Sequence, residues 1–337
     1  MTVASTGRTT KATAISCANI AFIKYWGRKN DTLRLPLNSS ISMNLDNATT
    51  TTTVVFDPAL AADELTLEGE DAETTARAAG RVTQHLDRVR EIARIPHRAR
   101  VVSRNSFPMG AGIASSASAF AALTVAATAA AGIELDQHAL SILARLGSGS
   151  ACRSIPAGFV EWHAADTSEL SYAESIAPPE HWDLRDLVAI VQTEHKLVGS
   201  TKGQALVDRS PFASVRLAEA ERALPLVRDA LLARDFDTFG IETEHEAIRM
   251  HVVAMTARPS VLYWSPETVR VKQADRAWRA EGLPAYFTID AGANVHVLCE
   301  GAHANELESC LRALEGVQDV IANRPGPGTR LIDTHLC

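Results

Sequence analysis

The chain has 337 residues, of which 46% are hydrophobic and 22% charged, and its net charge is −7 with histidines neutral. This length suffices for one large domain or two medium ones with a sizeable core. The mild acidity argues against nucleic acid or an anionic membrane surface as the main partner, because both require a basic face. No stretch approaches the length of a membrane span.

Residues 1–16 are rich in Thr and Ser and lack an apolar signal-peptide core, which predicts a short lead into the first strand. The segment "IAFIKYWGRKN" (20–30) then begins as a buried strand and ends in Lys24, Tyr25, Trp26, Gly27, Arg28 and Lys29. Charges are rarely buried without a partner. The strand therefore either surfaces into solvent here or directs its cations at an anion inside a cleft.

Strands and helices alternate irregularly along the rest of the chain. Predicted strands cover residues 40–46, 48–56, 98–105, 158–162, 183–194, 285–290 and 296–300 and the end of 320–332, the first of them antiparallel. Predicted helices cover residues 73–95, 111–131, 134–147, 201–235, 242–250 and 304–314, and a further helix begins within 148–154. Such mixing without strict strand–helix alternation favours the α+β class. The turn at Pro178–Pro179 predicts an N-terminal lobe (1–180) and a C-terminal lobe (181–337) with a cleft between them.

"FPMGAGIASSASAFAAL" (107–123) is the most informative stretch. Gly110 and Gly112 let the backbone approach a ligand, and the hydroxyls of Ser115 and Ser116 precede an Ala-rich helix. A Gly/Ser loop that opens a helix offers free N–H groups at the positive end of the helix dipole, which suits an anion. It is not a GxxxxGK[ST] loop, because no Lys follows. Capping and close packing alone would explain the same residues equally well.

"LGSGSACRS" (146–154) repeats this pattern, with Ser148 and Ser150 on either side of Gly149 and Arg153 one helical turn further on. The fork of an arginine suits a carboxylate or a phosphate. The alternative is a second capped helix with a surface arginine.

Asp290 follows a buried-looking strand and precedes a glycine turn, so it is either a catalytic base or a turn former. His245 and His251 are six residues apart rather than four and are not expected to form a zinc site. Five scattered cysteines without paired spacing fit a reducing cytoplasm.

Together these stretches resemble one family. "PMGAGIASS" (108–116) is similar to the phosphate loop of the galactokinase–homoserine kinase–mevalonate kinase–phosphomevalonate kinase (GHMP kinase) superfamily. "KYWGRKN", "LPLNSSIS", "ASSASAFAAL", "ARLGSGSACRS", "GFVEW", "GSTKGQ" and "DAGAN" resemble its diphosphomevalonate decarboxylase branch, in order from residue 20 to residue 294.

This resemblance implies a two-lobed GHMP-kinase-like fold, with an N-terminal lobe like domain 2 of ribosomal protein S5, a ferredoxin-like C-terminal lobe and the site in the cleft. It also implies ATP with Mg²⁺, phosphorylation of the C3 hydroxyl of a 5-phosphorylated mevalonate, and then loss of phosphate and CO2. Homodimers are common in the family, so a homodimer is expected, with small molecules rather than nucleic acid or membrane as partners.

The resemblance also implies roles for individual residues, without assigning protein ligands to the metal. Asp290 matches the catalytic aspartate, Arg153 the arginine that holds the substrate carboxylate, Lys24 the lysine beside it and Ser116 the serine near the transferred group. The substrate positions are Ser148 and Ser150 and, near the 5-phosphate, Tyr25, Arg28 and Arg81. The nucleotide positions are Asn105, Pro108, Gly110, Ala111, Gly112, Ala114, Ser115 and Ser200.

The chain departs from the family pattern at Arg28, Met109 and Ala293, where Lys, Thr and Pro are common. The last two departures are reminiscent of the branch that decarboxylates the monophosphate. Arg28 and Arg81, with Lys29 in possible reach, are enough cations for a monophosphate or a diphosphate, so the length of the phosphate tail stays open.

Two other functions compete with decarboxylation. A mevalonate 3-kinase would transfer phosphate without releasing CO2, and a ligand sensor on the same fold would catalyse nothing. Relatives of the first kind tend to lose the aspartate or the carboxylate arginine, and a sensor would be expected to lose the phosphate loop or the aspartate. Both Asp290 and Arg153 are present here.

Overall fold

Two long antiparallel strands, β1 (Thr10–Ile23) and β4 (Ser40–Asp57), organise the first lobe of the computed structural model, which describes residues 10–107, 115–192 and 198–337. Five more strands complete their sheet: β5 (Glu64–Glu68), β6 (Arg98–Asn105), β7 (Phe159–Trp162), β8 (Ala173–Ala177) and β13 (Arg330–Ile332). The order is β13-β1-β4-β6-β5, with β7 pairing with β4 and with β8. The β5–β6 pair is parallel and the other pairs are antiparallel, so the sheet is mixed.

The sequence pattern predicted strands at 40–46 and 48–56, but the structure joins them into the single strand β4. Its register against β1 shifts where Cys17 pairs with Thr49 and Ala18 pairs with Leu45. The exposed pair Asp46 and Asn47 falls inside this shift. A bulge therefore bends the strand where the sequence pattern suggested a break.

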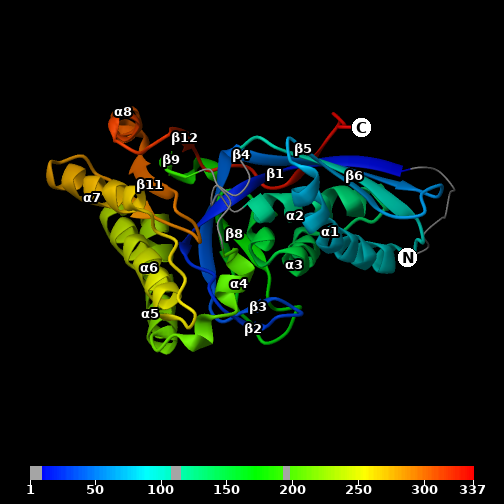
Figure 1. Ribbon diagram of the computed structural model, residues 1–337, viewed down its shortest axis with the longest axis horizontal. Helices are drawn as coiled ribbons and strands as arrows, with labels where there is room; N and C mark the ends of the chain where they lie inside the picture. The colour runs from blue at the N-terminus through cyan, green and yellow to red at the C-terminus, as the bar shows by residue number, and fades with distance from the viewer. Residues whose placement is uncertain (1–9, 108–114, 193–197) are drawn as a thin grey trace.

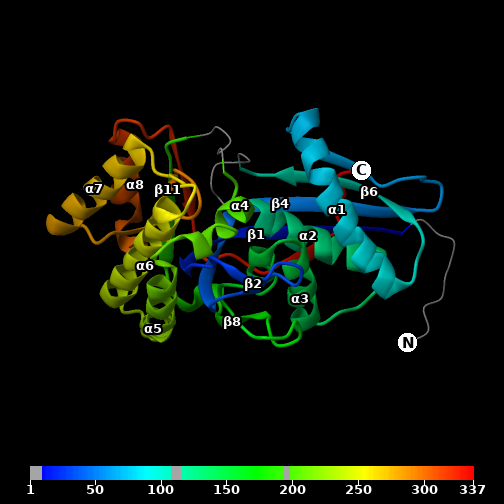
Figure 2. The ribbon, with the colours of Figure 1, turned by 60° about the horizontal axis from the view of Figure 1, so that its bottom comes forward.

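Three helices cover one face of this sheet: α1 (Ala72–Ala93), α2 (Ser115–Ala130) and α3 (Gln137–Gly147) (Figures 1 and 2). Helix α2 is rich in alanine and buried on nearly all sides, which lets it lie close against β1 and β4. Helix α3 ends at Gly147 as predicted, and the 3₁₀ helix Gly149–Ser154 follows at once. The loops that carry the candidate serines are thus held next to the sheet.

The second lobe contains a four-stranded sheet of β9 (Leu184–Ile190), β10 (Tyr286–Thr288), β11 (Val295–Glu300) and β12 (Asp319–Asn323), in the order β10-β11-β9-β12. Its helices are α4 (Ser200–Gln204), α5 (Ala213–Ala233), α6 (Phe236–Thr256), α7 (Pro266–Ala280) and α8 (Ala304–Ala313). Along the chain this gives strand, helices, strand, strand, helix, strand, which is the ferredoxin-like arrangement. The predicted α+β class and two-lobed fold are confirmed.

Two elements near the cleft were not predicted. Helix α7 begins with a capping box formed by Ser265 and Thr268, but it buries few apolar residues, so its helical pattern is weak in the sequence. A small hairpin pairs β2 (Arg28–Asn30) with β3 (Leu35–Pro36). Short 3₁₀ turns occur at Pro179–His181, Val207–Arg209 and Gly301–His303.

One of the hydrophobic clusters, which includes Phe22 and Phe239, is built from residues of both lobes. Phe22 of β1 meets Phe239 of α6 edge to face, with ring centroids 4.7 Å apart. The last part of the chain also crosses back to the first lobe, where strand β13 pairs with β1. The division into residues 1–180 and 181–337 stays a prediction. Among the described residues, no helix is both long and apolar enough to cross a bilayer.

Because two histidines are buried, we expect the free energy of unfolding to fall in mild acid. Burial lowers the pKa of His85 and of His251 from 6.5 to about 3. The unfolded chain binds protons on these groups as the pH drops below 6.5, whereas the folded protein does not do so until about pH 3. Each histidine should therefore lower the free energy of unfolding by about 2 kcal/mol near pH 5 relative to neutral pH.

The measurement is urea unfolding at neutral pH and near pH 5 for the wild type and for a His85→Gln, His251→Gln double variant. The double variant should lose less stability between the two pH values, whatever its stability at neutral pH. An equal loss in both proteins would contradict the assignment to these two histidines.

Candidate active site

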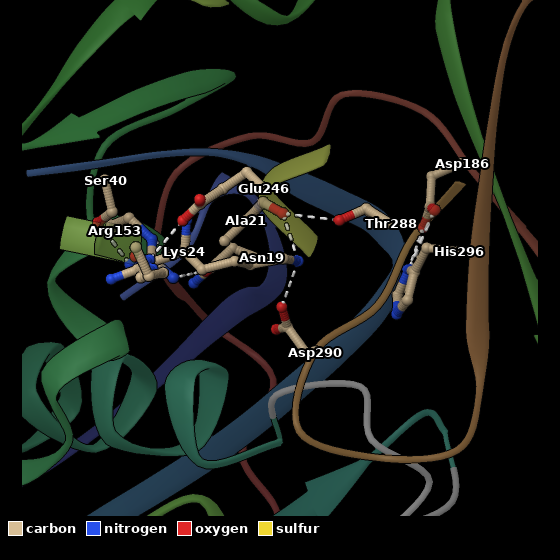
Figure 3. A network of polar contacts seen from close by, with 11 residues as sticks. Asn19, Ala21, Lys24, Ser40, Arg153, Asp186, Glu246, Thr288, Asp290 and His296 are labelled. Carbon is tan, nitrogen blue, oxygen red and sulfur yellow. Dashed lines mark hydrogen bonds and ion pairs between the residues drawn. The ribbon is translucent and has the colours of Figure 1, made fainter. Parts of the chain in front are cut away.

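Lys24 and Asp290 form a buried ion pair between the two lobes (Figure 3). Lys24 Nζ donates to Asp290 Oδ1 and to the Ala21 carbonyl, each at 2.6 Å. The Lys24 side chain is 1% exposed and that of Asp290 is 22% exposed. Burial raises the pKa of Asp290, but the charge and hydrogen bond of Lys24 outweigh it, so the net pKa lies below its usual value. Asp290 is therefore an ionised carboxylate at neutral pH.

Side chains from the second lobe fix the backbone around Lys24. Arg216 of α5 donates to the Lys24 carbonyl at 2.6 Å and to Asn38 Oδ1 at 2.7 Å. Its partner Glu246 of α6 accepts from the Lys24 backbone N–H at 3.3 Å. Gly27 then turns the chain at φ +103°, a value that favours glycine. The end of β1 is thus held rigidly against α5 and α6.

Asp290 lies in the loop between β10 and β11. The Gly292 N–H donates to the Asp290 carbonyl at 2.8 Å. Asn294 Oδ1 accepts from the backbone N–H groups of Val191 and Gln192 at 2.8 and 3.0 Å, which ties the loop to the end of β9. A defined turn, rather than a free loop, positions the carboxylate.

The Arg153 guanidinium is also buried and held by neutral partners. It donates to Asn19 Oδ1 at 3.0 and 3.3 Å and to Ser40 Oγ at 2.8 Å. Because neither partner carries a charge, the positive charge of Arg153 is left for a ligand. This arrangement contradicts the alternative of a surface arginine.

A first cavity brings most of the predicted residues together. Its wall includes Lys24, Tyr25, Arg28, Ser116, Ser148, Ser150, Arg153 and Asp290. Tyr25 packs on Trp162 with ring centroids 4.6 Å apart and lies against Gly149, where a Cβ would come within 2.6 Å of the tyrosine ring. Burial raises the pKa of Tyr25, which keeps its hydroxyl a hydrogen-bond donor. Lys24 and Arg28, two of the three cations that follow β1, line this cavity, so for these two the chain directs its cations into a cleft rather than into solvent.

A second cavity of about 230 Å³ lies beside the first, between α1, α2 and the β5–β6 edge. Leu65, Leu67 and Val101 give it an apolar wall, and Asn105 and Ser115 contribute polar groups. Ser116 lines both cavities, and its hydroxyl lies 3.1 Å from that of Ser148. The two cavities therefore meet at this pair of hydroxyls.

Two predicted residues line a different cavity from the other residues predicted for the same ligand. Arg81, expected near the 5-phosphate, lines the second cavity, because its guanidinium stacks over Phe120 at 4.8 Å and donates to the Gly147 carbonyl at 3.1 Å. Ser200, expected near the nucleotide, lines the first cavity, because α4 lies beside the β2–β3 hairpin. Lys29 lines neither cavity and pairs with Asp166 at 2.6 Å.

Five predicted phosphate-loop residues, Pro108, Gly110, Ala111, Gly112 and Ala114, fall outside the described residues, as does Met109. Their roles stay predictions. The residue that follows them, Ser115, begins α2 at the edge of the second cavity.

Several residues of the site were missed in the sequence. Asn19 and Ser40 position Arg153, and Arg34 lines the first cavity. A signal was available for Ser40 in the quoted motif "LPLNSSIS", which also contains Asn38. No local signal distinguishes Asn19 or Arg34, because the fold alone brings them to the site.

Both predicted cofactors suit the groups present. Asparagine and serine hydrogen-bonding groups beside an apolar wall suit a nucleoside. The described residues contain no cluster of three or more His, Cys, Asp or Glu side chains able to hold a metal ion. Mg²⁺ in nucleotide enzymes is usually held by one or two protein oxygens together with phosphates. Asp290 and Ser116 offer such oxygens on one wall.

Comparison with known proteins agrees with these features over most of the chain. The family model described as diphosphomevalonate decarboxylase-like N-terminal domain matches residues 16–173, and the mevalonate 5-diphosphate decarboxylase C-terminal domain matches residues 186–325. A diphosphomevalonate decarboxylase from Ganoderma lucidum is 35% identical over 322 residues, covering 88% of this chain and 80% of the relative. A phosphomevalonate decarboxylase from Haloferax volcanii is 33% identical, covering 89% and 92%.

The solved structure of MDDEF in complex with MVAPP, AMPPCP and magnesium is 38% identical, with a TM-score of 0.90 over 97% of this chain and all of that one. The fold, both family models and the relatives indicate the same family. The chain belongs to the diphosphomevalonate decarboxylase family.

Proposed function

We propose that this protein catalyses the ATP-dependent decarboxylation of a 5-phosphorylated mevalonate in isoprenoid biosynthesis. The observation that carries the proposal is the junction of two cavities at Ser116 and Ser148, beside an ionised Asp290 and a buried Arg153. A phosphoryl donor in the second cavity and an acceptor alcohol in the first would meet at this junction. Positioning and charge stabilisation supply most of the catalysis in phosphoryl transfer.

In the first step, Asp290 orients the C3 hydroxyl or accepts its proton as the γ-phosphoryl group is transferred. Lys24 keeps this carboxylate ionised and in place from 2.6 Å. The hydroxyl of Ser116 and the N-terminal end of α2 face the transferred group, where a positive helix end favours phosphate. Mg²⁺, when bound, neutralises charge that builds up on the phosphates.

In the second step, phosphate leaves C3 and positive character develops on that carbon. The bond to the carboxylate then breaks, and its electron pair forms the new double bond as CO2 departs. Arg153 holds the carboxylate in line through the free part of its guanidinium, and Asn19 and Ser40 hold Arg153. Tyr25 and Arg28 lie on the same wall as donors to the 5-phosphate end.

The test is the release of CO2 and inorganic phosphate with ATP and mevalonate, 5-phosphomevalonate or 5-diphosphomevalonate. Both phosphorylated compounds should be turned over with kcat/KM above that of mevalonate by at least about tenfold, which corresponds to about 1.4 kcal/mol. Arg28→Ala should reduce this preference, because it removes a cation of the first cavity. Equal values for plain mevalonate would contradict the substrate assignment, and ADP formation without CO2 would indicate the 3-kinase instead.

Two finer proposals follow from the family resemblance alone. We infer that the protein acts as a homodimer and that it works in the cytoplasm. The five unpaired cysteines are compatible with that compartment. Sedimentation analysis of the purified protein tests the first of these proposals.

A further inference from the structure

Arg34 is a cation of the first cavity to which neither the family motifs nor the proposed mechanism assigns a role. It stands at the end of the turn between β2 and β3, and its side chain reaches the wall of the cavity. Its Nε donates to the Leu146 carbonyl at 3.0 Å, near the C-terminus of α3. Its guanidinium thus lies between the hairpin and the loop that carries Ser148 and Ser150.

The backbone of Arg34 has an unusual conformation. Its φ is +51°, in the left-handed region that L-residues other than glycine, asparagine and aspartate rarely adopt. Among the described residues, Arg94 and Arg234 are the other non-glycine residues with positive φ, and both are exposed caps at helix C-termini, where this conformation is common. Arg34 caps no helix with its backbone. A glycine would adopt this conformation with less strain, so we expect the arginine side chain at this position to have a function of its own.

Among the described residues, the cations that act on Arg34 outnumber the carboxylates that do. Lys24 pairs with Asp290, and Arg28 lies 3.1 Å from Asp31, whose side chain is 78% exposed. Arg34 makes no ion pair with any described carboxylate, although the charge of Asp31 acts on it favourably, and the charges of two cations, Arg28 and Arg88, act on it unfavourably. Burial and these two neighbours lower its pKa. Several cations beside a cavity with only one exposed carboxylate among them indicate an anionic ligand.

We propose that Arg34 is the specificity-determining residue for the substrate tail: with Arg28 it binds the terminal phosphate of a diphosphate, so that 5-diphosphomevalonate is preferred over 5-phosphomevalonate. The proposal rests on the proposed function and deepens it. From Lys24 outward the chain reaches Arg28 and then the turn at Arg34, since Arg28 pairs with Pro36 across the hairpin. The backbone of Arg34 therefore lies nearer the tip of the hairpin than that of Arg28, and both residues line the same cavity.

The variant Arg34→Gly separates recognition from folding. It removes the guanidinium and at the same time suits the positive φ, so the melting temperature should be unchanged or higher. Charge-assisted hydrogen bonds typically contribute roughly ten- to a hundredfold in affinity. The variant should lower kcat/KM for 5-diphosphomevalonate by that factor and change the value for 5-phosphomevalonate by less than about threefold.

Arg94→Gly and Arg234→Gly are matched controls, because they make the same change at positive φ away from either cavity. Neither should alter the preference between the two substrates. The proposal is wrong if the wild type prefers the monophosphate, or if Arg34→Gly lowers kcat/KM for both substrates by the same factor.

Calorimetric titration with 5-diphosphomevalonate in the absence of nucleotide distinguishes this proposal from the proposed function. If the wild type releases CO2 from neither compound, the proposed function fails, and the Kd still decides the role of Arg34. A Kd weakened about tenfold or more in Arg34→Gly supports the role of Arg34. An unchanged Kd overturns it.

Discussion

Replacement of Asp290 by asparagine should lower kcat by about a hundred- to ten-thousandfold while the protein still folds and binds ATP. Asparagine keeps the shape and an oxygen acceptor for Lys24, but it removes the charge that orients or deprotonates the C3 hydroxyl. A positioned general base typically contributes a rate factor of about this size. The measurement is steady-state CO2 release, with the melting temperature and the Kd for ATP as checks on folding.

Asp166→Asn is the control for Asp290→Asn, since it removes an exposed carboxylate that pairs with Lys29 outside both cavities. Its kcat should stay within about threefold of the wild type, as for most surface changes. A loss of less than about tenfold in Asp290→Asn would remove Asp290 from the catalytic role.

Arg153→Met should impair decarboxylation more than phosphoryl transfer. Methionine fills much of the space of the arginine stem but cannot hold a carboxylate, and the carboxylate must be held once phosphate begins to leave C3. We expect CO2 release to fall by at least about a hundredfold, the usual effect of losing one charge-stabilising donor. A quenched single turnover should then show a 3-phosphorylated intermediate that accumulates.

Removing Arg153 also takes the donor from Asn19 Oδ1 and from Ser40 Oγ, at a cost of about 1–3 kcal/mol in stability for each buried acceptor left unpaired. Arg145→Met controls for this, because Arg145 is also fully buried but bonds to Ser168 and Ser171 rather than lining either cavity. It should lower the melting temperature and leave CO2 release per folded molecule intact. Wild-type CO2 release in Arg153→Met would transfer the carboxylate role to another cation, with Lys24 the first to test.

Individual residues show how far the sequence could predict this site. Lys24, Arg153 and Asp290 were predicted because each lies in a motif that resembles one of the family's motifs. Their geometry could not be predicted, since Lys24 and Asp290 are 266 positions apart and meet only because the lobes share a core. Asn19 was not predicted for the same reason, because its side chain takes part in the site only by holding Arg153.

Arg81 and Ser200 show a second limit. Sequence spacing places a residue on a helix, but the rotation and packing of that helix decide which cavity the side chain enters. Stacking on Phe120 holds Arg81 on the wall of the second cavity, and the contact of α4 with the hairpin brings Ser200 to the first. In the fold, strand β4 could be predicted only as two pieces, because a bulge and a turn look alike in sequence.

The return of β13 to β1 has a consequence for biosynthesis. Thr13 pairs with Ile332, and Lys11 Nζ donates to the Cys337 carbonyl at 2.9 Å, so the edge of the first sheet is built from residues more than three hundred positions apart. While the ribosome makes the intervening segment, β1 presents an unpaired edge, which is open to strands of other nascent chains. Contacts this distant in sequence also form slowly. We therefore expect the growing polypeptide to be most prone to aggregation before residues 330–332 emerge and close that edge.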